Sequence, residues 1–239
     1  MDDWKKQENT VRTVRIKEDI TSRNNAQASQ IRQALRKKGI FYLNVMSSPG
    51  SGKTTLLVSL IRRLRNDYRI GVIEADIDSD VDARTISQTG VKTIQMHTAG
   101  ACHITCQMSR EALDALGTEE LDVVILENIG NLVCPAEFDT GAEKNLVLLS
   151  VPEGDDKPLK YPLMFEAASA VVITKTDTAP AFDFSAERAR ENVRRRNPEA
   201  PVFFTSALTG AGVEAVEDYL RAEITKLKNA GGNPAETGI

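Results

Sequence analysis

A glycine- and serine-rich stretch at residues 47–54, Ser-Ser-Pro-Gly-Ser-Gly-Lys-Thr, directly follows an apolar run over residues 39–46. A strand that enters such a turn and leaves it as a helix is typical of a phosphate-binding P-loop. The small residues let backbone N–H groups surround phosphate oxygens, and the following helix turns its positive end towards the anion. The usual pattern G-x-x-x-x-G-K-S/T begins with glycine, where this chain has Ser47. The motif predicts a nucleoside triphosphate as the ligand.

The residue types of this loop predict separate roles within it. We expect Lys53 to reach the β- and γ-phosphates and the Thr54 hydroxyl to bind Mg²⁺. The predicted nucleotide-binding residues of the loop are Pro49, Gly50, Ser51, Gly52, Lys53, Thr54 and Thr55.

Composition limits the class of protein. The chain has 239 residues, 41 % of them hydrophobic, which is enough for the core of one α/β domain. The formal net charge of −4 argues against nucleic acid as a general partner. Apolar runs are too short to span a membrane, and the first residues lack a signal-peptide pattern. We therefore expect a cytoplasmic protein without a membrane partner.

Apolar runs alternate with amphipathic stretches from residue 40 onwards. Strands are predicted at residues 40–46, 70–74, 93–96, 122–126, 145–151, 170–174 and 202–205. Helices are predicted at residues 53–65, 82–88, 103–116, 186–195 and 213–228. This alternation predicts an α/β fold, a mostly parallel sheet flanked by helices. The domain boundaries follow: an N-terminal helical arm at 1–38, a P-loop domain at 39–228 and a disordered tail at 229–239.

Acidic residues follow two of the predicted strands. Asp76 lies just beyond the strand at 70–74, and Glu127 just beyond the strand at 122–126. Ligands of parallel sheets bind at the carboxyl ends of strands, so both carboxylates are candidates for contact with Mg²⁺. The alternative is that both belong to solvated acidic loops.

Two short motifs predict which base the nucleotide carries. The sequence Thr-Lys-Thr-Asp at residues 174–177 is similar to the Asn-Lys-x-Asp guanine motif, with Thr174 in place of asparagine. The carboxylate of Asp177 would accept hydrogen bonds that guanine donates and adenine cannot, while Lys175 would lie over the base. The run Ser206-Ala207-Leu208 is similar to the segment whose backbone contacts guanine O6. GTP is therefore favoured over ATP.

Cysteine and histidine supply a candidate site for a softer metal. Cys102, His103 and Cys134 are ligand types for Zn²⁺ or Ni²⁺, and the alternative is buried structural thiols. We expect the dipole of a helix beginning near His103 to favour the Cys102 thiolate. Cys106 is an auxiliary ligand or an inert core thiol, with the inert role favoured. His97 is expected to form a local hydrogen bond rather than to bind metal.

Taken together, these segments resemble the HypB family, GTPases that insert nickel during maturation of nickel–iron hydrogenases. The resemblance covers about residues 44–212 and rests on four stretches, at residues 46–55, 102–103, 127–139 and 153–162. Most of the chain is therefore similar to one family, and the two stretches at 127–139 and 153–162 are too specific for a generic P-loop protein.

The resemblance implies a metallochaperone with slow intrinsic GTP hydrolysis to GDP. It implies that Cys102, His103 and Cys134 bind Ni²⁺ or Zn²⁺ between the subunits of a GTP-dependent homodimer. Another nickel-maturation accessory protein and the hydrogenase large subunit are the implied partners. The alternative is a delivery module for another nickel enzyme in which GTP only controls dimerisation. A small-molecule kinase is disfavoured because no segment is a candidate acceptor-binding lid.

The chain departs from the family pattern in three places. Residues 97–101 read His-Thr-Ala-Gly-Ala, where the family usually has Asn-Thr-Gly-Lys. No cysteine precedes Cys102, so an N-terminal cysteine-rich nickel motif is absent from this sequence. Its 2 histidines cannot form a histidine-rich storage segment. Any nickel handled by this sequence is expected to use the site in the P-loop domain.

Overall fold

A computed structural model describes residues 16–77 and 79–231, with the side chains of residues 21–77 and 79–230. Seven strands form a single parallel sheet in the order β3-β2-β4-β1-β5-β6-β7. The strands are β1 Phe41–Ser47, β2 Ile70–Asp76, β3 Lys92–His97, β4 Val123–Glu127, β5 Lys144–Ser150, β6 Ala170–Thr174 and β7 Val202–Phe204. The predicted parallel α/β fold is confirmed, and each predicted strand corresponds to one observed strand.

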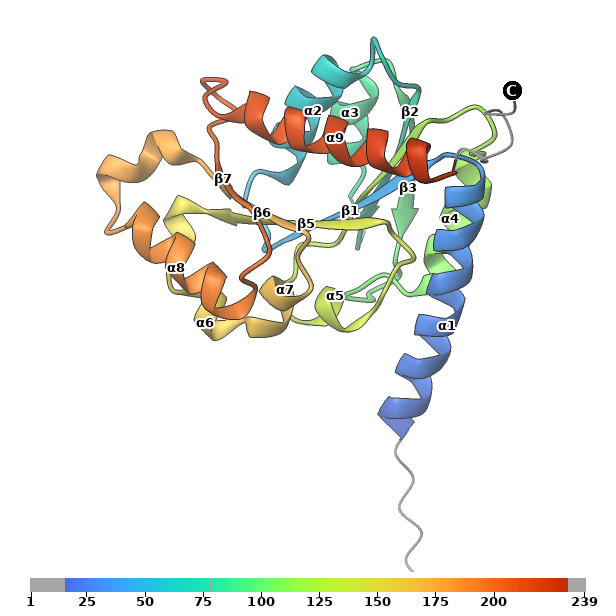
Figure 1. The fold of residues 1–239 in the computed structure, drawn as a ribbon, viewed down its shortest axis with the longest axis horizontal. Helices are drawn as coiled ribbons and strands as arrows, with labels where there is room; N and C mark the ends of the chain where they lie inside the picture. Colours follow the sequence, from blue (N-terminus) through green and yellow to red (C-terminus); the bar gives the residue numbers. More distant parts are fainter. Residues whose placement is uncertain (1–15, 78, 232–239) are drawn as a thin grey trace, which may run out of the picture.

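Helices cover both faces of this sheet (Figure 1). The α-helices are α1 Ile16–Lys37, α2 Lys53–Leu64, α3 Val81–Ser87, α4 Cys106–Leu116, α5 Cys134–Glu137, α6 Lys157–Lys160, α7 Pro162–Glu166, α8 Ala186–Arg196 and α9 Val213–Gly231. Two 3₁₀ helices, η1 Val151–Glu153 and η2 Thr176–Ala181, follow β5 and β6.

One face of the sheet packs against α2, α3 and α9. Alternate residues of β1, such as Leu43 and Val45, form a buried cluster there with Leu57 of α2 and Leu220 of α9. The opposite face is covered by α1 and α4 at one end and by α5, α7 and α8 at the other. Since buried β1 residues meet helices on both faces, the strand is apolar almost throughout.

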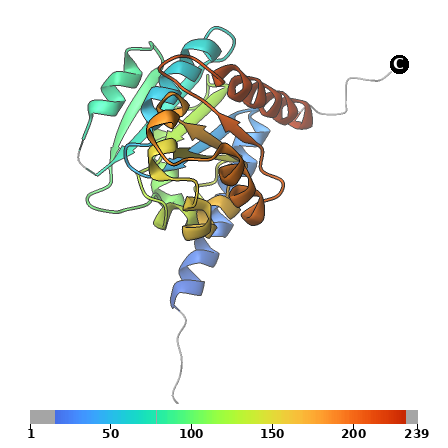
Figure 2. The ribbon, with the colours of Figure 1, turned by 90° about the vertical axis from the view of Figure 1, so that its left-hand side faces the viewer.

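The N-terminal arm packs on the domain through its second half. Ala28, Ile31 and Leu35 join the buried cluster that also contains Leu113 of α4. The first half of α1 projects beyond the rest of the domain in both Figure 1 and Figure 2. Residues 1–15 of the predicted arm lie outside the described part of the chain.

Several predicted boundaries were wrong. The helix expected from residue 103 begins at Cys106, because Thr105 is its N-cap and accepts a hydrogen bond from the Met108 N–H at 3.3 Å. The last helix continues to Gly231, so residues 229–231 of the expected tail are helical. Residues 232–239 lie outside the described part of the chain. The three short helices α5, α6 and α7 were not predicted, because four or five residues carry too little periodicity to detect.

Candidate nucleotide and metal sites

The P-loop connects β1 to α2 at the carboxyl edge of the sheet. Gly50 and Gly52 have φ angles of 72° and 91°, in the region that residues with a side chain rarely adopt. Both glycines are therefore required to turn the backbone before α2 begins at Lys53. The turn lines a cavity of about 340 Å³ together with Lys53, Thr54 and Thr55.

Ser47, the departure from the usual motif, forms hydrogen bonds within the loop. Its buried hydroxyl donates to the Ser48 carbonyl at 2.7 Å and accepts from Ser51 Oγ. Lys53 Nζ donates to the same hydroxyl at 3.0 Å. A glycine could make none of these side-chain bonds, so Ser47 fixes the lysine ammonium beside the loop. Burial lowers the pKa of Lys53, while the carboxylates of Glu127 and Asp82 oppose that shift.

Carboxylates at the ends of neighbouring strands face Lys53 across the cavity. Asp76 ends β2, Glu127 ends β4, and both line the cavity. Thr54 Oγ1 donates to Glu127 Oε1 at 2.7 Å, which places the helix hydroxyl against the strand carboxylate. Asp76 Oδ1 accepts from the Ser79 N–H at 2.8 Å and so orders the loop after β2. Hydroxyl and carboxylate oxygens are the ligands that Mg²⁺ prefers, so this group fits that ion.

Sequence reasoning missed two acidic residues of this cavity, Glu74 and Asp82. Glu74 lies directly beside Glu127 in the parallel register of β2 and β4 and is 3 % exposed. The even spacing of Glu74 and Asp76 along a strand was the available signal, because both then lie on one face. Asp82 lies in the first turn of α3, and no pattern in the sequence indicated its position.

Burial raises the pKa of both buried glutamates above the usual value of a carboxyl group. Burial raises the pKa of Glu74 to about 8, and the neighbouring Glu127 raises it further. Burial likewise raises the pKa of Glu127 to about 7, although Thr54 and Lys53 oppose the shift. Glu74 Oε2 and Glu127 Oε2 are both buried and have no hydrogen-bond partner among the described residues. A cation in the cavity would provide the partner that these oxygens lack.

The loop after β6 also contacts the P-loop. Thr174 Oγ1 donates to the Ser51 carbonyl at 2.6 Å, and Lys175 Nζ donates to the Gly50 carbonyl at 2.6 Å. Thr174, which stands in place of the asparagine of the guanine motif, is thus hydrogen-bonded directly to the P-loop. Asp177 lies exposed in η2, two residues beyond Lys175.

The segment predicted to contact the base lies beside this loop. The Thr176 N–H donates to the Thr205 carbonyl at 3.1 Å, so the loop after β6 is bonded to the residue that precedes Ser206. Ser206 is buried, and Leu208 is 83 % exposed. Ala207 lines a second cavity of about 540 Å³ that adjoins the first through Thr54 and Thr55. Among the residues predicted to contact the base, Lys175 lines the phosphate cavity.

The three predicted ligands of a softer metal lie together. The ligand atoms of Cys102, His103 and Cys134 are all within 4.8 Å of one another. Cys102 precedes α4 in the loop after β3, and Cys134 begins α5 after β4. These two strands are separated in the sheet only by β2, so their following loops meet at the same edge. The imidazole of His103 stacks on Phe138 with ring centroids 3.9 Å apart and an angle of 16°. We refer to these three ligands as the metal trio.

Protonation in the trio differs from the expectation for Cys102. A hydrogen bond with Cys134 raises the pKa of the Cys102 thiol, and burial adds to the rise. The expected thiolate stabilisation by a helix dipole was wrong, because α4 begins four residues later, at Cys106. Burial lowers the pKa of His103, which favours the neutral imidazole that a metal binds.

Cys106 and His97 lie outside the metal trio. Cys106 is buried in the cluster beneath α1, and its backbone N–H donates to Asn24 Oδ1 at 2.8 Å. Burial raises the pKa of its thiol. His97 is the exposed last residue of β3. The structure gives neither residue a place among the grouped ligands of the described chain.

Comparison with known proteins agrees with this geometry. Residues 41–204 match the family model described as the CobW/HypB/UreG nucleotide-binding domain. The hydrogenase maturation factor HypB of Rhizobium leguminosarum bv. viciae is 42 % identical over 215 residues, covering 90 % of this chain and 72 % of the relative. The hydrogenase/urease maturation factor HypB of Helicobacter pylori (strain ATCC 700392 / 26695) is 42 % identical, covering 87 % and 86 %.

A solved structure has the same fold at similar identity. The crystal structure of HypB from Helicobacter pylori in complex with nickel superposes with a TM-score of 0.80 and 40 % identity. The match covers 85 % of this chain and 96 % of that one. In the described residues, we find no helix long and apolar enough to cross a bilayer. The chain therefore belongs to the HypB family of hydrogenase maturation factors, whose nucleotide-binding domain is common to CobW, HypB and UreG.

Proposed function

We propose that this protein is a GTP-hydrolysing metallochaperone that binds nickel, or zinc, and assists nickel insertion into nickel–iron hydrogenase. The observation that carries this proposal is the arrangement of two sites on one sheet edge. A phosphate cavity follows β1, β2 and β4, and the metal trio lies on loops that follow β3 and β4. A protein that exchanges metal under nucleotide control needs both sites in one chain.

Hydrolysis in this proposal depends on positioning and charge. Lys53 and the backbone of residues 49–55 bind the phosphates, while Lys175, Asp177 and the 206–208 segment select guanine. Water attacks the γ-phosphorus, a new P–O bond forms, and the bond to the β-phosphate oxygen breaks to give GDP and phosphate. The Lys53 ammonium, held beside Ser47, neutralises charge that develops on the phosphates.

Magnesium is the proposed ion of the phosphate cavity. Thr54, Asp76 and Glu127 would hold it, with Glu74 buried beside them. When bound, Mg²⁺ neutralises phosphate charge and orients the reacting groups. It would also favour the ionised form of Glu127, whose pKa burial has raised to about 7.

The cargo metal is assigned to Cys102, His103 and Cys134. Two thiols and an imidazole suit both Ni²⁺ and Zn²⁺, so the donor set supports either ion. Three protein ligands leave a coordination position open, which suits a metal that must be passed on.

Subunit assembly is part of the proposal. We assign a GTP-dependent homodimer, supported by exposed apolar side chains beside the sites: Ile77 next to Asp76, Val81 next to Asp82, and Val133 next to Cys134. The further partners are another nickel-maturation accessory protein and the hydrogenase large subunit. We retain the division into an arm at 1–38 and a GTPase domain that begins at residue 39, with the predicted end of that domain moved from residue 228 to the end of α9 at Gly231.

This function can be tested by complementation of a bacterial strain that lacks its own HypB. The wild-type chain is expected to restore hydrogenase activity, whereas Lys53→Ala and Cys134→Ala are not. Restoration by Lys53→Ala would favour the alternative in which GTP only controls dimerisation. Restoration by both variants, at wild-type protein levels, would contradict the proposed function.

A further inference from the structure

The side chain of Asn131 lies on the segment that connects the phosphate cavity to the metal trio. Asn131 belongs to the segment at residues 128–133, which leads from the end of β4 at Glu127 to the start of α5 at Cys134. Its backbone N–H donates to the carbonyl of Ser47 in the P-loop at 2.8 Å. This bond uses main-chain atoms, so it persists whatever side chain residue 131 carries.

The amide side chain of Asn131 contacts both loops that carry the trio. Nδ2 donates to the carbonyl of Cys102 at 3.3 Å, and Oδ1 accepts from the N–H of Val133 at 2.8 Å. Val133 immediately precedes Cys134. One residue is therefore bonded to the P-loop, to the Cys102 peptide and to the residue before Cys134.

Packing at the preceding residue ties this segment more tightly to the P-loop. A Cβ atom added to Gly130 would lie 2.9 Å from both Cα and N of Pro49, closer than real contacts allow. The segment thus rests directly on the loop that binds phosphate. Because Gly130 is in close contact with Pro49 and the Asn131 N–H is bonded to Ser47, we expect a displacement of Ser47 and Pro49 to shift residues 130 and 131.

We propose that Asn131 is a positioning residue that couples the nucleotide state of the P-loop to the geometry of the metal trio. The inference rests on the proposed function and names the contact through which its regulation passes. When a γ-phosphate shifts the P-loop, the backbone of Asn131 follows, and its amide group moves the Cys102 and Val133 peptides relative to each other. The separation of the two sulfur atoms then changes, and with it the affinity for metal.

Calorimetric titration of Ni²⁺ tests this role in the full chain. The wild-type dissociation constant is measured with GDP and with a non-hydrolysable GTP analogue, and we expect the two values to differ at least about fivefold. In Asn131→Ala we expect this ratio to fall to about one. A general loss of stability would weaken binding in both states without abolishing their ratio.

Two further variants locate the effect. Asn66→Ala removes an exposed asparagine on the loop after α2 and is expected to keep the wild-type ratio. Asn131→Asp keeps an acceptor for the Val133 N–H but cannot donate to the Cys102 carbonyl, so its ratio is also expected to approach one. If Asn131→Ala does not fold, Asn131→Asp decides the question, with the nickel–thiolate absorption band reporting on the Cys102 ligand.

The outcomes separate this inference from the proposed function. A wild-type ratio that persists in both Asn131 variants overturns the coupling role and leaves the metallochaperone function standing. Equal wild-type affinities in the two nucleotide states overturn both. Loss of the ratio in the Asn131 variants, with its retention in Asn66→Ala, supports the inference.

Discussion

The phosphate cavity and the metal trio lie on the same edge of one sheet but are built differently. The cavity is set by regular elements: Glu127 ends β4, Asp76 ends β2, and Lys53 begins α2. Its carboxylates at Glu74 and Glu127 are buried and desolvated. The trio instead lies on connecting segments, with Cys102 exposed and His103 and Cys134 half-buried.

This difference separates a fixed site from an adjustable one. The end of β4 at Glu127 is paired with β1 on one side and β2 on the other, so it cannot move on its own. The trio is held by a few loop contacts, including the Asn131 amide and the stacking of His103 on Phe138. We infer that the strand-end carboxylates of the nucleotide site are preformed, whereas the P-loop beside them responds to the γ-phosphate and the metal ligands can be repositioned at low cost.

The largest expected effect follows from Lys53→Ala. Its ammonium is fixed by Ser47 Oγ and faces the buried carboxylates, so its loss removes the charge that stabilises the transferring phosphate. We predict that GTP hydrolysis falls at least about a hundredfold. Phosphate release at saturating GTP measures this, and Ni²⁺ affinity without nucleotide should be unchanged. Normal turnover in the variant would contradict the assignment of the cavity.

The reciprocal change is Cys134→Ala, with Cys106→Ala as the matched control. Cys134 contributes one of three grouped ligand atoms, while Cys106 is a core thiol beneath α1. We predict that nickel affinity falls at least about a hundredfold in Cys134→Ala, since even outer contacts of metal sites cost 10–100-fold. GDP affinity should stay within about twofold, because the phosphate cavity is built from other elements. Equal nickel affinity in the two variants would show that Cys134 is not a ligand.

Glu74→Gln tests the desolvation of the cavity. The folded-state pKa of Glu74 is raised to about 8, so the folded protein binds a proton that the unfolded chain lacks between about pH 8 and 4.5. Stability without nucleotide should therefore rise as pH falls from 8 to 6, by on the order of 2 kcal/mol. Glu74→Gln should be more stable than wild type at pH 8 and keep only the weaker pH dependence that comes from Glu127, whose pKa is raised to about 7. Urea unfolding at both pH values measures it, and an unchanged slope with pH would contradict the prediction.

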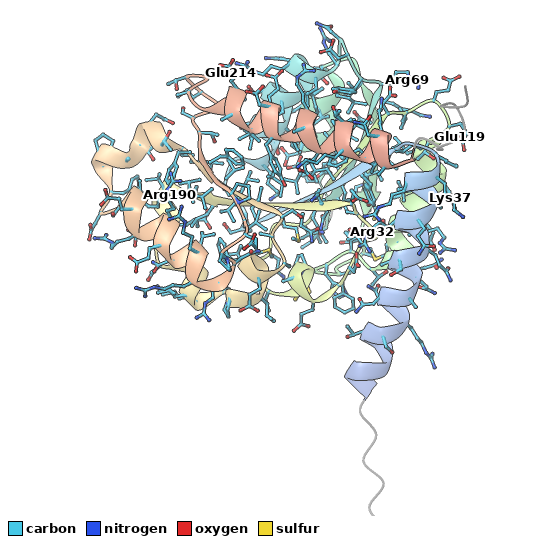
Figure 3. All side chains as sticks on the ribbon, in the orientation of Figure 1. Arg32, Lys37, Arg69, Glu119, Arg190 and Glu214 are labelled. Carbon is cyan, nitrogen blue, oxygen red and sulfur yellow. The ribbon has the colours of Figure 1, made fainter. Side chains whose placement is uncertain are left out.

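The smallest expected effect is that of Arg32→Ala on α1. Arg32, labelled in Figure 3, donates from Nη2 to both carboxylate oxygens of Asp139 at 2.7 Å. Its Nε donates to the Ala142 carbonyl at 2.8 Å. Because the pair is partly exposed, we predict a loss of about 1 kcal/mol in unfolding free energy. Nickel affinity should be unaffected, although Asp139 follows the Phe138 that stacks on His103. A large loss of nickel affinity would instead show that α1 helps to position the metal trio.

The elements that were predictable from the sequence are those with strong local signals. The P-loop was predicted from its glycines and Lys53. The strands were predicted from runs of valine, isoleucine and leucine. The start of α4 was missed because Thr105, a capping residue, was outweighed by an apolar pattern that continues back to His103.

The relations between distant residues were harder to predict. The position of Glu74 beside Glu127 could be predicted only from the register of β2 against β4. The contact of Asn131 with Cys102 joins two loops that are separated in the sequence by a helix and a strand. Single-sequence patterns carry no information on register or on loop-to-loop hydrogen bonds. The principal ligands of both sites were therefore visible in the sequence, whereas Glu74 in the phosphate cavity and the Asn131 contact beside the metal trio required the three-dimensional structure.

The most direct test of the account is the affinity of the wild-type protein for Ni²⁺ in its two nucleotide states. Calorimetric titration with GDP and with a non-hydrolysable GTP analogue should give dissociation constants that differ at least about fivefold. That result would establish that the nucleotide site controls the adjustable metal site. Identical constants, with Cys134→Ala still abolishing nickel binding, would contradict the account and leave two independent sites on one domain.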